Sequence, residues 1–178
     1  GVGNESPDAS DDTNYVFCRV SAGGEPASES WDMAASVKGC AIIWGITRPG
    51  NPVTGAAITT IDIHNIAMEI SSATITTGAN INPASFTPSI PGGTKDYLWL
   101  SLIGMDSETA TASNGALSNV QNANSGTGGA VASNCMIWGG SQTSTSVSSV
   151  DIAAWTSSAP NSGASAYTVA IYPVTAAD

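Results

Sequence analysis

Charge is what this sequence has least of. Only 10% of its residues are Asp, Glu, Lys or Arg, against about 25% in an ordinary soluble domain. The imbalance is strong as well, because 4 basic residues stand against 14 acidic ones and the net charge is −10. Binding to a nucleic-acid backbone or to an anionic membrane needs clustered Lys and Arg. We therefore expect neither nucleic acid nor membrane as a partner, and a surface made polar by Ser, Thr, Asn and Gly.

The sequence is also poor in residues that could act as the general base beside a nucleophile or bind zinc. His64 is the only histidine, it follows an apolar run, and no G-x-S-x-G motif accompanies it. Cys18, Cys40 and Cys135 all lie in apolar runs without C-x-x-C spacing, which favours reduced cysteines that pack as small apolar side chains. A disulfide with one thiol left over, or a metal site, is the alternative. Reduced thiols are typical of proteins that fold in a reducing cytoplasm.

The acidic residues form no catalytic or metal-binding pattern. Asp106 and Glu108 follow an apolar stretch but stand one residue apart in a polar loop, as solvent-facing turn residues do. Asp8, Asp11 and Asp12 lack the spacing of an EF-hand loop. We expect no catalytic residue, no bound cofactor and no metal, and we expect a protein that is not an enzyme.

Long hydrophobic runs are absent too. No stretch reaches the roughly 18 apolar residues of a membrane helix, and the polar start, GVGNESPDASDD, has no features of a signal peptide. That start lacks an initiator Met, so we expect a processed or truncated chain. Apolar residues nevertheless make up 42% of 178 residues, which is enough for one core. We predict a polar lead over residues 1–13 and a single domain over residues 14–178.

What the sequence does have is apolar and polar residues in alternation, the pattern of half-buried strands. Residues 37–47 (VKGCAIIWGIT) are apolar throughout and predict a strand buried on both faces. Residues 95–105 (KDYLWLSLIGM) are the most apolar and predict the central strand. Residues 165–174 predict a strand with one face made by Tyr167, Val169, Ile171 and Pro173. Further strands are predicted over residues 14–20, 29–34, 58–63, 68–77 and 130–138.

The connections between these strands are rich in Pro, Gly, Ser and Thr. Residues 80–91 predict an extended crossing segment anchored by Phe86, and residues 106–129 predict a long surface excursion with one weak strand at 116–121. A Ser/Thr stretch covers residues 139–149, before a short strand at 148–152. Helical patterns are weak, at residues 62–69 and 151–157 only. Many short strands between turns predict an all-β fold, an antiparallel β-sandwich that is jelly-roll-like or immunoglobulin-like.

Five tryptophans are the remaining candidates for a binding site. Trp44, Trp99 and Trp138 lie within apolar runs and are predicted to belong to the core. Trp31 and Trp155 stand in the more polar stretches ESWDM and AAWTSS. Exposed aromatic rings can stack on sugars, so Trp31 and Trp155 are our candidate surface contacts for a glycan.

Two long blocks of the sequence resemble a diverse group of structural proteins encoded by tailed bacteriophages and prophages. Residues 16–50 (VFCRVSAGGEPASESWDMAASVKGCAIIWGITRPG) are similar to a "YYRVA-GGEPxSYxW" strand pair followed by "xxAVVWRISG". Residues 83–106 (PASFTPSIPGGTKDYLWLSLIGMD) are similar to "xPSxTPxxGGxxDYLWLAxxGxD". The closing AYTVAIYPV resembles "AATIAIRPA".

The resemblance implies a β-sandwich component of the virion, on head or tail, without assigned catalytic residues. It implies a capsid decoration or fibre-like protein that is assembled in the host cytoplasm, contacts other virion proteins and forms a homo-oligomer. Members of the group usually carry further N-terminal strands, with "GDLLL" and "PAGW" segments, that this sequence lacks. Either the first sheet is incomplete, or a neighbouring subunit's strand completes it. The alternative function is a module that binds a host receptor or a surface glycan.

Overall fold

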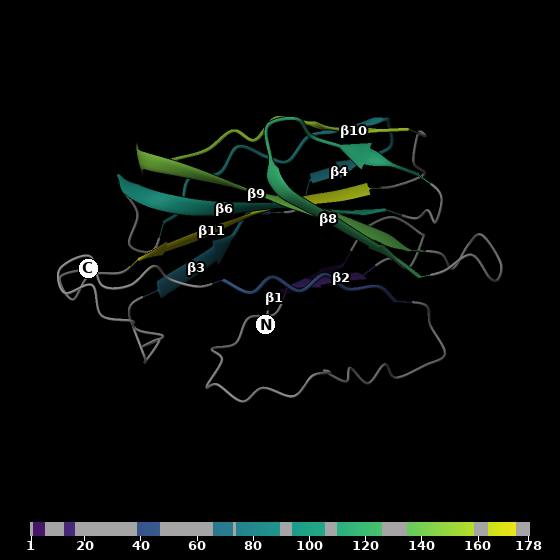
Figure 1. Ribbon diagram of the computed structural model, residues 1–178, viewed down its shortest axis with the longest axis horizontal. Helices are drawn as coiled ribbons and strands as arrows, with labels where there is room; N and C mark the ends of the chain where they lie inside the picture. The colour runs from purple at the N-terminus through teal and green to yellow at the C-terminus, as the bar shows by residue number, and fades with distance from the viewer. Residues whose placement is uncertain are drawn as a thin grey trace.

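The computed structural model describes residues 2–5, 13–16, 39–46, 66–72, 74–89, 94–105, 110–125, 135–158 and 164–173. Within these ranges the regular structure is all strand, and every strand pair is antiparallel. A six-stranded sheet faces a three-stranded sheet, and a separate hairpin lies near the first of them (Figure 1). The predicted all-β, antiparallel fold with two facing sheets is therefore confirmed.

The six-stranded sheet is built around two long apolar strands. Its order is β3-β11-β6-β9-β8, with β4 also paired to β11. The predicted central strand is β6, whose β-branched and aromatic residues favour the extended chain, and it lies between β11 and β9. The bounds are β3 Ile66–Ile70, β4 Thr74–Thr76, β6 Lys95–Met105, β8 Ser118–Asn124, β9 Met136–Val147 and β11 Ala164–Pro173.

One edge of this sheet is a strand interrupted at Ser71. β3 and β4 pair with successive parts of β11, and Ser71 bridges them. The backbone N–H of Ser71 donates to the carbonyl of Thr168 (2.8 Å), and the N–H of Thr168 donates to the Ser71 hydroxyl (3.0 Å). The serine side chain thus replaces one backbone bond of the ladder, so the strand predicted over residues 68–77 is present in two pieces.

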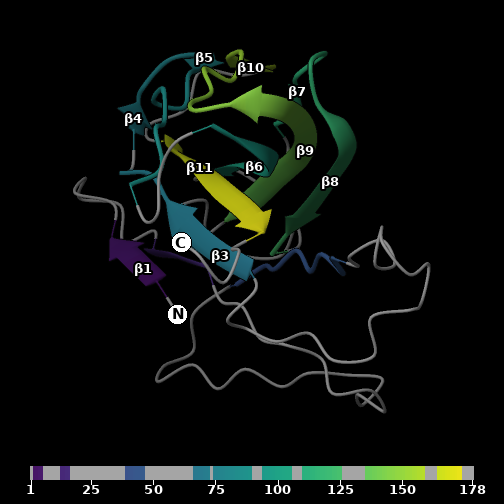
Figure 2. The ribbon, with the colours of Figure 1, turned by 90° about the vertical axis from the view of Figure 1, so that its left-hand side faces the viewer.

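The three-stranded sheet has short strands in the order β5-β10-β7. Its bounds are β5 Asn80–Ile81, β7 Ala112–Ser113 and β10 Trp155–Ser157. A bridge between Phe86 and Val150 extends the contact between the segments that flank it. Figure 2 shows β5, β7 and β10 above the six-stranded sheet. The hairpin pairs β1 (Val2–Glu5) with β2 (Thr13–Val16).

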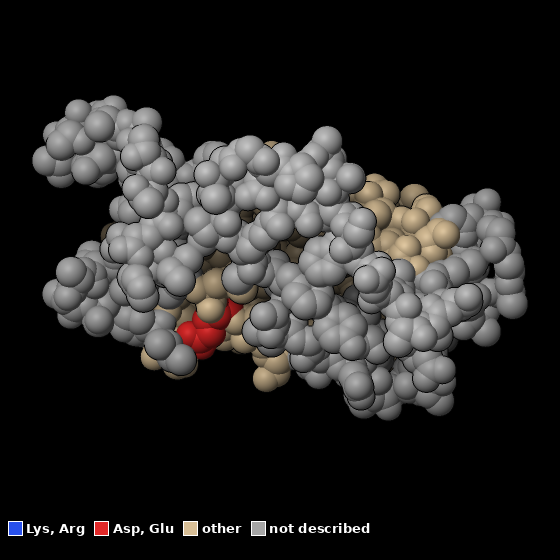
Figure 3. Space-filling model, turned by 90° about the horizontal axis from the view of Figure 1, so that it is seen from below, with Lys and Arg blue, Asp and Glu red and all other residues tan. Residues whose placement is uncertain are grey.

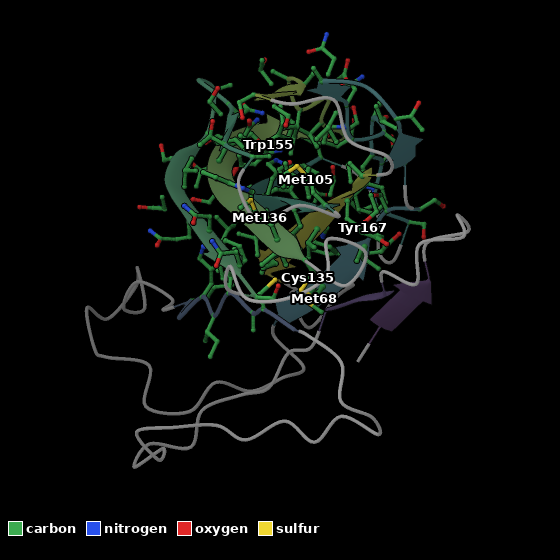
Figure 4. All side chains as sticks on the ribbon, turned by 90° about the vertical axis from the view of Figure 1, so that its right-hand side faces the viewer. Met68, Met105, Cys135, Met136, Trp155 and Tyr167 are labelled. Carbon is green, nitrogen blue, oxygen red and sulfur yellow. The ribbon has the colours of Figure 1, made fainter. Side chains whose placement is uncertain are left out.

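The face of the six-stranded sheet that turns toward the small sheet, here called the inner face, holds most of the core. Ile103 and Met105 of β6 pack there with Trp155 and Ile81 of the small sheet, and Trp99 packs in a second cluster with Ile152. Met105, Met136 and Trp155 are seen between the sheets in Figure 4. The indole N–H of Trp155 donates to the hydroxyl of Ser101 (2.8 Å), so a buried polar bond joins the two sheets.

The opposite face, here called the outer face, is apolar as well. Leu100 and Leu102 of β6 pack with Tyr167, Val169 and Ile171 of β11, all of them buried. The predicted grouping of the three β11 residues on one face is confirmed. Partly buried Met68, Ile70, Leu98 and Trp44 extend this cluster. Both faces of the sheet therefore need cover.

The structure corrects several local predictions. Residues 139–147 were expected in a loop but belong to β9, and residues 148–152 form only the bridge at Val150. The weak helical patterns are wrong where they are described, since they fall on β3 and β10. β1 lies within the expected polar lead. The strands predicted over residues 29–34 and 58–63 fall outside the described residues.

Candidate interaction surface

Residues 39–46 (GCAIIWGI) form an extended segment beneath the outer face (Figure 1). Its exposure alternates: Cys40, Ile42 and Trp44 are half-buried, whereas Ala41 and Ile43 are exposed. The period of two is that of a strand, yet the segment pairs with no strand among the described residues. The predicted strand buried on both faces is therefore wrong over residues 39–46, because one side of the segment faces solvent.

Trp44 fixes the segment against β9. Its ring lies directly over Gly139, where an added Cβ would be 2.7 Å from Cζ2 of the ring and 3.0 Å from Cδ2 of Leu102. Only glycine leaves room for the indole at that position. Trp44 Nε1 is buried and finds no hydrogen-bond partner in the part of the chain that the structure describes. The contact therefore depends on shape and apolar packing alone.

A second contact joins the start of the segment to the residue that precedes β9. The sulfur atoms of Cys40 and Cys135 are 3.4 Å apart, and the two residues are separated by 95 positions. Trp44 and Gly139 have the same separation. Because both contacts share one offset, the segment runs alongside residues 135–139 in the same direction. Cys135 lies with Met68 on the outer-face side of the sheet (Figure 4).

The outward side of the segment is apolar and exposed. Ile43 is 75% exposed, and Ala41 and Gly45 are exposed on the same side of the segment, while Ile46, at the end of the segment, is 40% exposed. Among the residues whose side-chain exposure is described, the other large apolar side chain with comparable exposure is Val120, at 36%. Exposed apolar side chains gathered in one row mark interaction surfaces more often than isolated ones do.

The other exposed strand, β8, has a different character. It is an edge strand of the six-stranded sheet. Its side chains are mostly Ser, Asn and Gln, and nearly all of them are exposed. Its pairing with β9 shifts between Ser118 and Gln121, and Asn119 adopts a positive φ of 51°. A bulge and polar side chains are the devices by which proteins keep sheet edges from pairing with other chains. The 39–46 segment has neither device.

The described residues that are visible from below carry little charge. From below, the described residues show acidic atoms in one place and no Lys or Arg (Figure 3). Of the acidic residues, Glu69 has a clear structural task, because its carboxylate accepts bonds from the backbone N–H of Ser89 (3.0 and 2.9 Å) and from its hydroxyl (3.0 Å). That contact ties the extended segment 82–89 to β3.

Among the described residues, the fold shifts the pKa of two tyrosines. Tyr97 stacks on Trp99 (centroids 4.4 Å apart) and meets Tyr172 edge-on. Burial raises the pKa of Tyr97, while Lys95 lowers it and Glu69 raises it by smaller amounts. Burial also raises the pKa of Tyr167 on the outer face, against a smaller lowering by the neighbouring Ser165. Both hydroxyls favour their neutral form because the charged form would lose hydration.

The candidate glycan contacts fare differently. Trp155 is fully buried and hydrogen-bonded to Ser101, so the prediction of an exposed ring there is wrong. Its polar neighbours Thr156 and Ser158 face solvent, so the polarity of the stretch reflects these residues and does not indicate that Trp155 is exposed. Trp31 lies outside the described residues. Of the predicted core tryptophans, Trp99 is fully buried, and Trp138 and Trp44 are half-buried.

The remaining residues weighed for chemistry, His64, Asp106, Glu108, Cys18 and the aspartates 8, 11 and 12, also lie outside the described residues. Within the described ranges, no group of three or more His, Cys, Asp or Glu side chains could hold a metal ion. A search of the same residues finds no helix long and apolar enough to cross a membrane.

The outward row of the 39–46 segment is the feature that sequence reasoning missed. The signal was present: the run CAIIWGI is apolar at odd and even positions alike. That pattern fits burial on both faces, and it fits equally a strand that buries one face and keeps the other for a partner. The glycine pair Gly139-Gly140 was the second signal, since adjacent glycines in a strand leave room for side chains from elsewhere.

Comparison with known proteins adds no relative. No protein-family model matches the chain, and neither a curated protein nor a solved structure is significantly similar to it.

Proposed function

We propose that this chain is a structural protein of a tailed-bacteriophage virion, a capsid decoration or fibre-like protein that acts through subunit interfaces rather than through a reaction. The observation that carries the proposal is the outward row of the 39–46 segment, where Ile43 is 75% exposed. This row lies within residues 16–50, one of the two blocks that resemble phage structural proteins. Decoration of a particle calls for such a contact surface on a stable β domain.

The partner that suits this row is a second copy of the chain. The segment carries no charged residue, although the net charge of the chain is −10, so two copies can meet there without bringing like charges together. Its backbone is extended and pairs with no strand among the described residues. Two such segments related by a two-fold axis can pair edge to edge, as in strand addition between subunits.

Mass spectrometry of purified particles tests the function. The expected result is that the chain co-purifies with intact virions through a density gradient, in a fixed ratio to the major capsid protein. Absence of the chain from intact virions, with presence only in the infected-cell lysate, would overturn the proposal.

Light scattering over a range of concentrations tests the interface. Wild type is expected to associate, and Ile43→Ser is expected to shift the midpoint of association at least tenfold toward higher concentration. Val120→Ser, an exposed apolar residue on β8, serves as the matched control and should leave association unchanged. An equal effect of the two variants would contradict an interface at the 39–46 segment.

A further inference from the structure

Two cysteines from distant parts of the chain meet beneath the six-stranded sheet. Cys40 and Cys135 are both half-buried, their sulfur atoms are 3.4 Å apart, and no bond joins them. In a disulfide the sulfurs are about 2.05 Å apart. A bond therefore needs the two sulfurs to approach by on the order of 1.4 Å.

Each cysteine is held in place by its own surroundings. The backbone N–H of Cys135 donates to the hydroxyl of Ser125 (3.1 Å), and the N–H of Ser125 donates to the carbonyl of Cys135 (2.9 Å). Cys40 is placed by Trp44, four residues along the same extended segment, whose ring is fitted over Gly139. Because these two contacts share one offset of 95 residues, docking of Trp44 brings the sulfurs opposite each other.

We propose that Cys40 and Cys135 form a disulfide that locks the 39–46 segment to β9 when the protein meets a disulfide oxidant. One thiolate attacks a small-molecule disulfide such as oxidised glutathione, which forms a mixed disulfide and releases one glutathione thiolate. The second thiolate then attacks the protein sulfur of that mixed disulfide and releases the second glutathione. Two protein thiols are oxidised, one glutathione disulfide is reduced, and the two thiol protons leave to solvent.

The bond changes what holds the outer face closed. In the reduced protein the segment is retained by packing of Trp44, Ile42 and Cys40, whereas in the oxidised protein it is joined covalently to β9. The closed loop spans 95 residues, and a loop of that length strongly restricts the unfolded chain. The segment would thus be docked while the two thiols stay reduced and become locked when the protein meets oxidising surroundings. This inference does not depend on the proposed function.

The experiment uses the whole chain with its cysteines varied. After incubation with oxidised glutathione, intact-mass analysis should show the loss of two hydrogens, and peptide mapping should find one Cys40–Cys135 cross-link. The oxidised protein should melt roughly 5–15 °C above the dithiothreitol-treated protein. Cys18→Ser leaves only Cys40 and Cys135 and should keep both the cross-link and the shift in melting temperature. Cys40→Ser and Cys135→Ser should each lose both.

Three outcomes would overturn the proposal: a cross-link that contains Cys18, an absence of cross-link in Cys18→Ser, or an oxidised Cys18→Ser that melts no higher than its reduced form. Because Cys40→Ser and Cys135→Ser remove opposite ends of the bond, a folding defect in one of them leaves the other to decide. The mass shift and the mapped cross-link in Cys18→Ser decide independently of both.

Discussion

The two faces of the six-stranded sheet are closed in different ways. Over the inner face lies a hydrogen-bonded sheet, and its Trp155 is fully buried with its indole N–H bonded to Ser101. Over the outer face lies an extended segment that belongs to none of the described sheets, and its half-buried Trp44 keeps an indole N–H without a partner among the described residues. Trp155 is both packed in the core and hydrogen-bonded, whereas Trp44 is held only by packing of its ring over Gly139.

The difference indicates that the cover of the inner face is fixed, whereas the cover of the outer face can rearrange or bind a partner. A buried donor that has a partner offsets the hydration it loses on burial, whereas a buried donor without one makes its cover less stable by the hydration it has lost. A cover held by packing alone, with exposed apolar residues on its far side, can dock a neighbour or accept a covalent lock. Four predictions test this contrast.

The largest effect should come from the tryptophan of the inner face. Trp155→Ala removes a fully buried ring and should lower the free energy of unfolding by about 3–5 kcal/mol. Trp44→Ala, the matched change on the outer face, should cost clearly less because Trp44 is only half-buried. Urea unfolding of both variants measures the difference. A cost for Trp44→Ala equal to that of Trp155→Ala would contradict the contrast between the faces.

The next effect tests the glycine beneath Trp44. In Gly139→Ala the new Cβ would lie 2.7 Å from a ring carbon of Trp44, so the segment must move, at a cost of about 1–3 kcal/mol. In Gly140→Ala the new Cβ would meet Leu117 and Val120 at 3.0–3.2 Å on the other face, and the cost should be smaller. Alanine has a higher strand propensity than glycine in both variants, so this contribution cancels when the two are compared.

Urea unfolding, together with limited proteolysis of the 39–46 segment, reports on that pair of variants. Faster cleavage in Gly139→Ala than in Gly140→Ala is expected. Equal cleavage would mean that Trp44 does not anchor the segment.

A smaller effect tests the polar bond of the inner face. Ser101→Ala leaves the buried indole N–H of Trp155 without its acceptor and should lower the free energy of unfolding by about 1–2 kcal/mol. In the double variant with Trp155→Phe, the loss of unfolding free energy should be less than the sum of the two single losses. The hydrogen bond is already absent after either change, so the second change cannot remove it again. Strict additivity in this double-mutant cycle would show that the bond is not formed in solution.

The smallest effect is a dependence on alkaline pH. Burial raises the pKa of Tyr97 and of Tyr167 above the ordinary value of 10.0. The unfolded chain therefore loses these protons first, and stability that is complete below about pH 10 declines as pH rises through the folded pKa values. Unfolding curves at pH 9 and pH 11 should show the decline, and Tyr97→Phe and Tyr167→Phe should each reduce it. A stability that stays flat to pH 11 would argue against buried neutral hydroxyls.

The sequence was informative where a strand supplies its own apolar face. β6 begins and ends at the residues predicted, because a run rich in aromatic and aliphatic residues stands between a Gly-Gly pair and a polar stretch of sequence. β11 begins and ends within one residue of its prediction, since Tyr167, Val169 and Ile171 alternate along it. In both strands the information is local, so periodicity alone could find it.

It was uninformative where a strand receives side chains from elsewhere. β9 contributes Gly139, Gly140 and a run of Ser and Thr, and the apolar groups that fill those places come from Trp44 and Leu117. Trp155 was misjudged for the same reason, because its acceptor Ser101 lies 54 residues away. The outward row of the 39–46 segment could not be predicted from its composition, since double burial and single burial produce the same apolar run.

Hydrogen exchange of the amides in residues 41–46 tests the central contrast most directly. In dilute isolated protein these amides should exchange at least about 100-fold faster than those of Ser101–Ile103 in β6, because they pair with no strand among the described residues. In purified particles, or in the associated protein, they should become protected while the amides of β8 change little. Protection of residues 41–46 equal to that of β6 in the isolated protein, or no gain on assembly, would contradict the account.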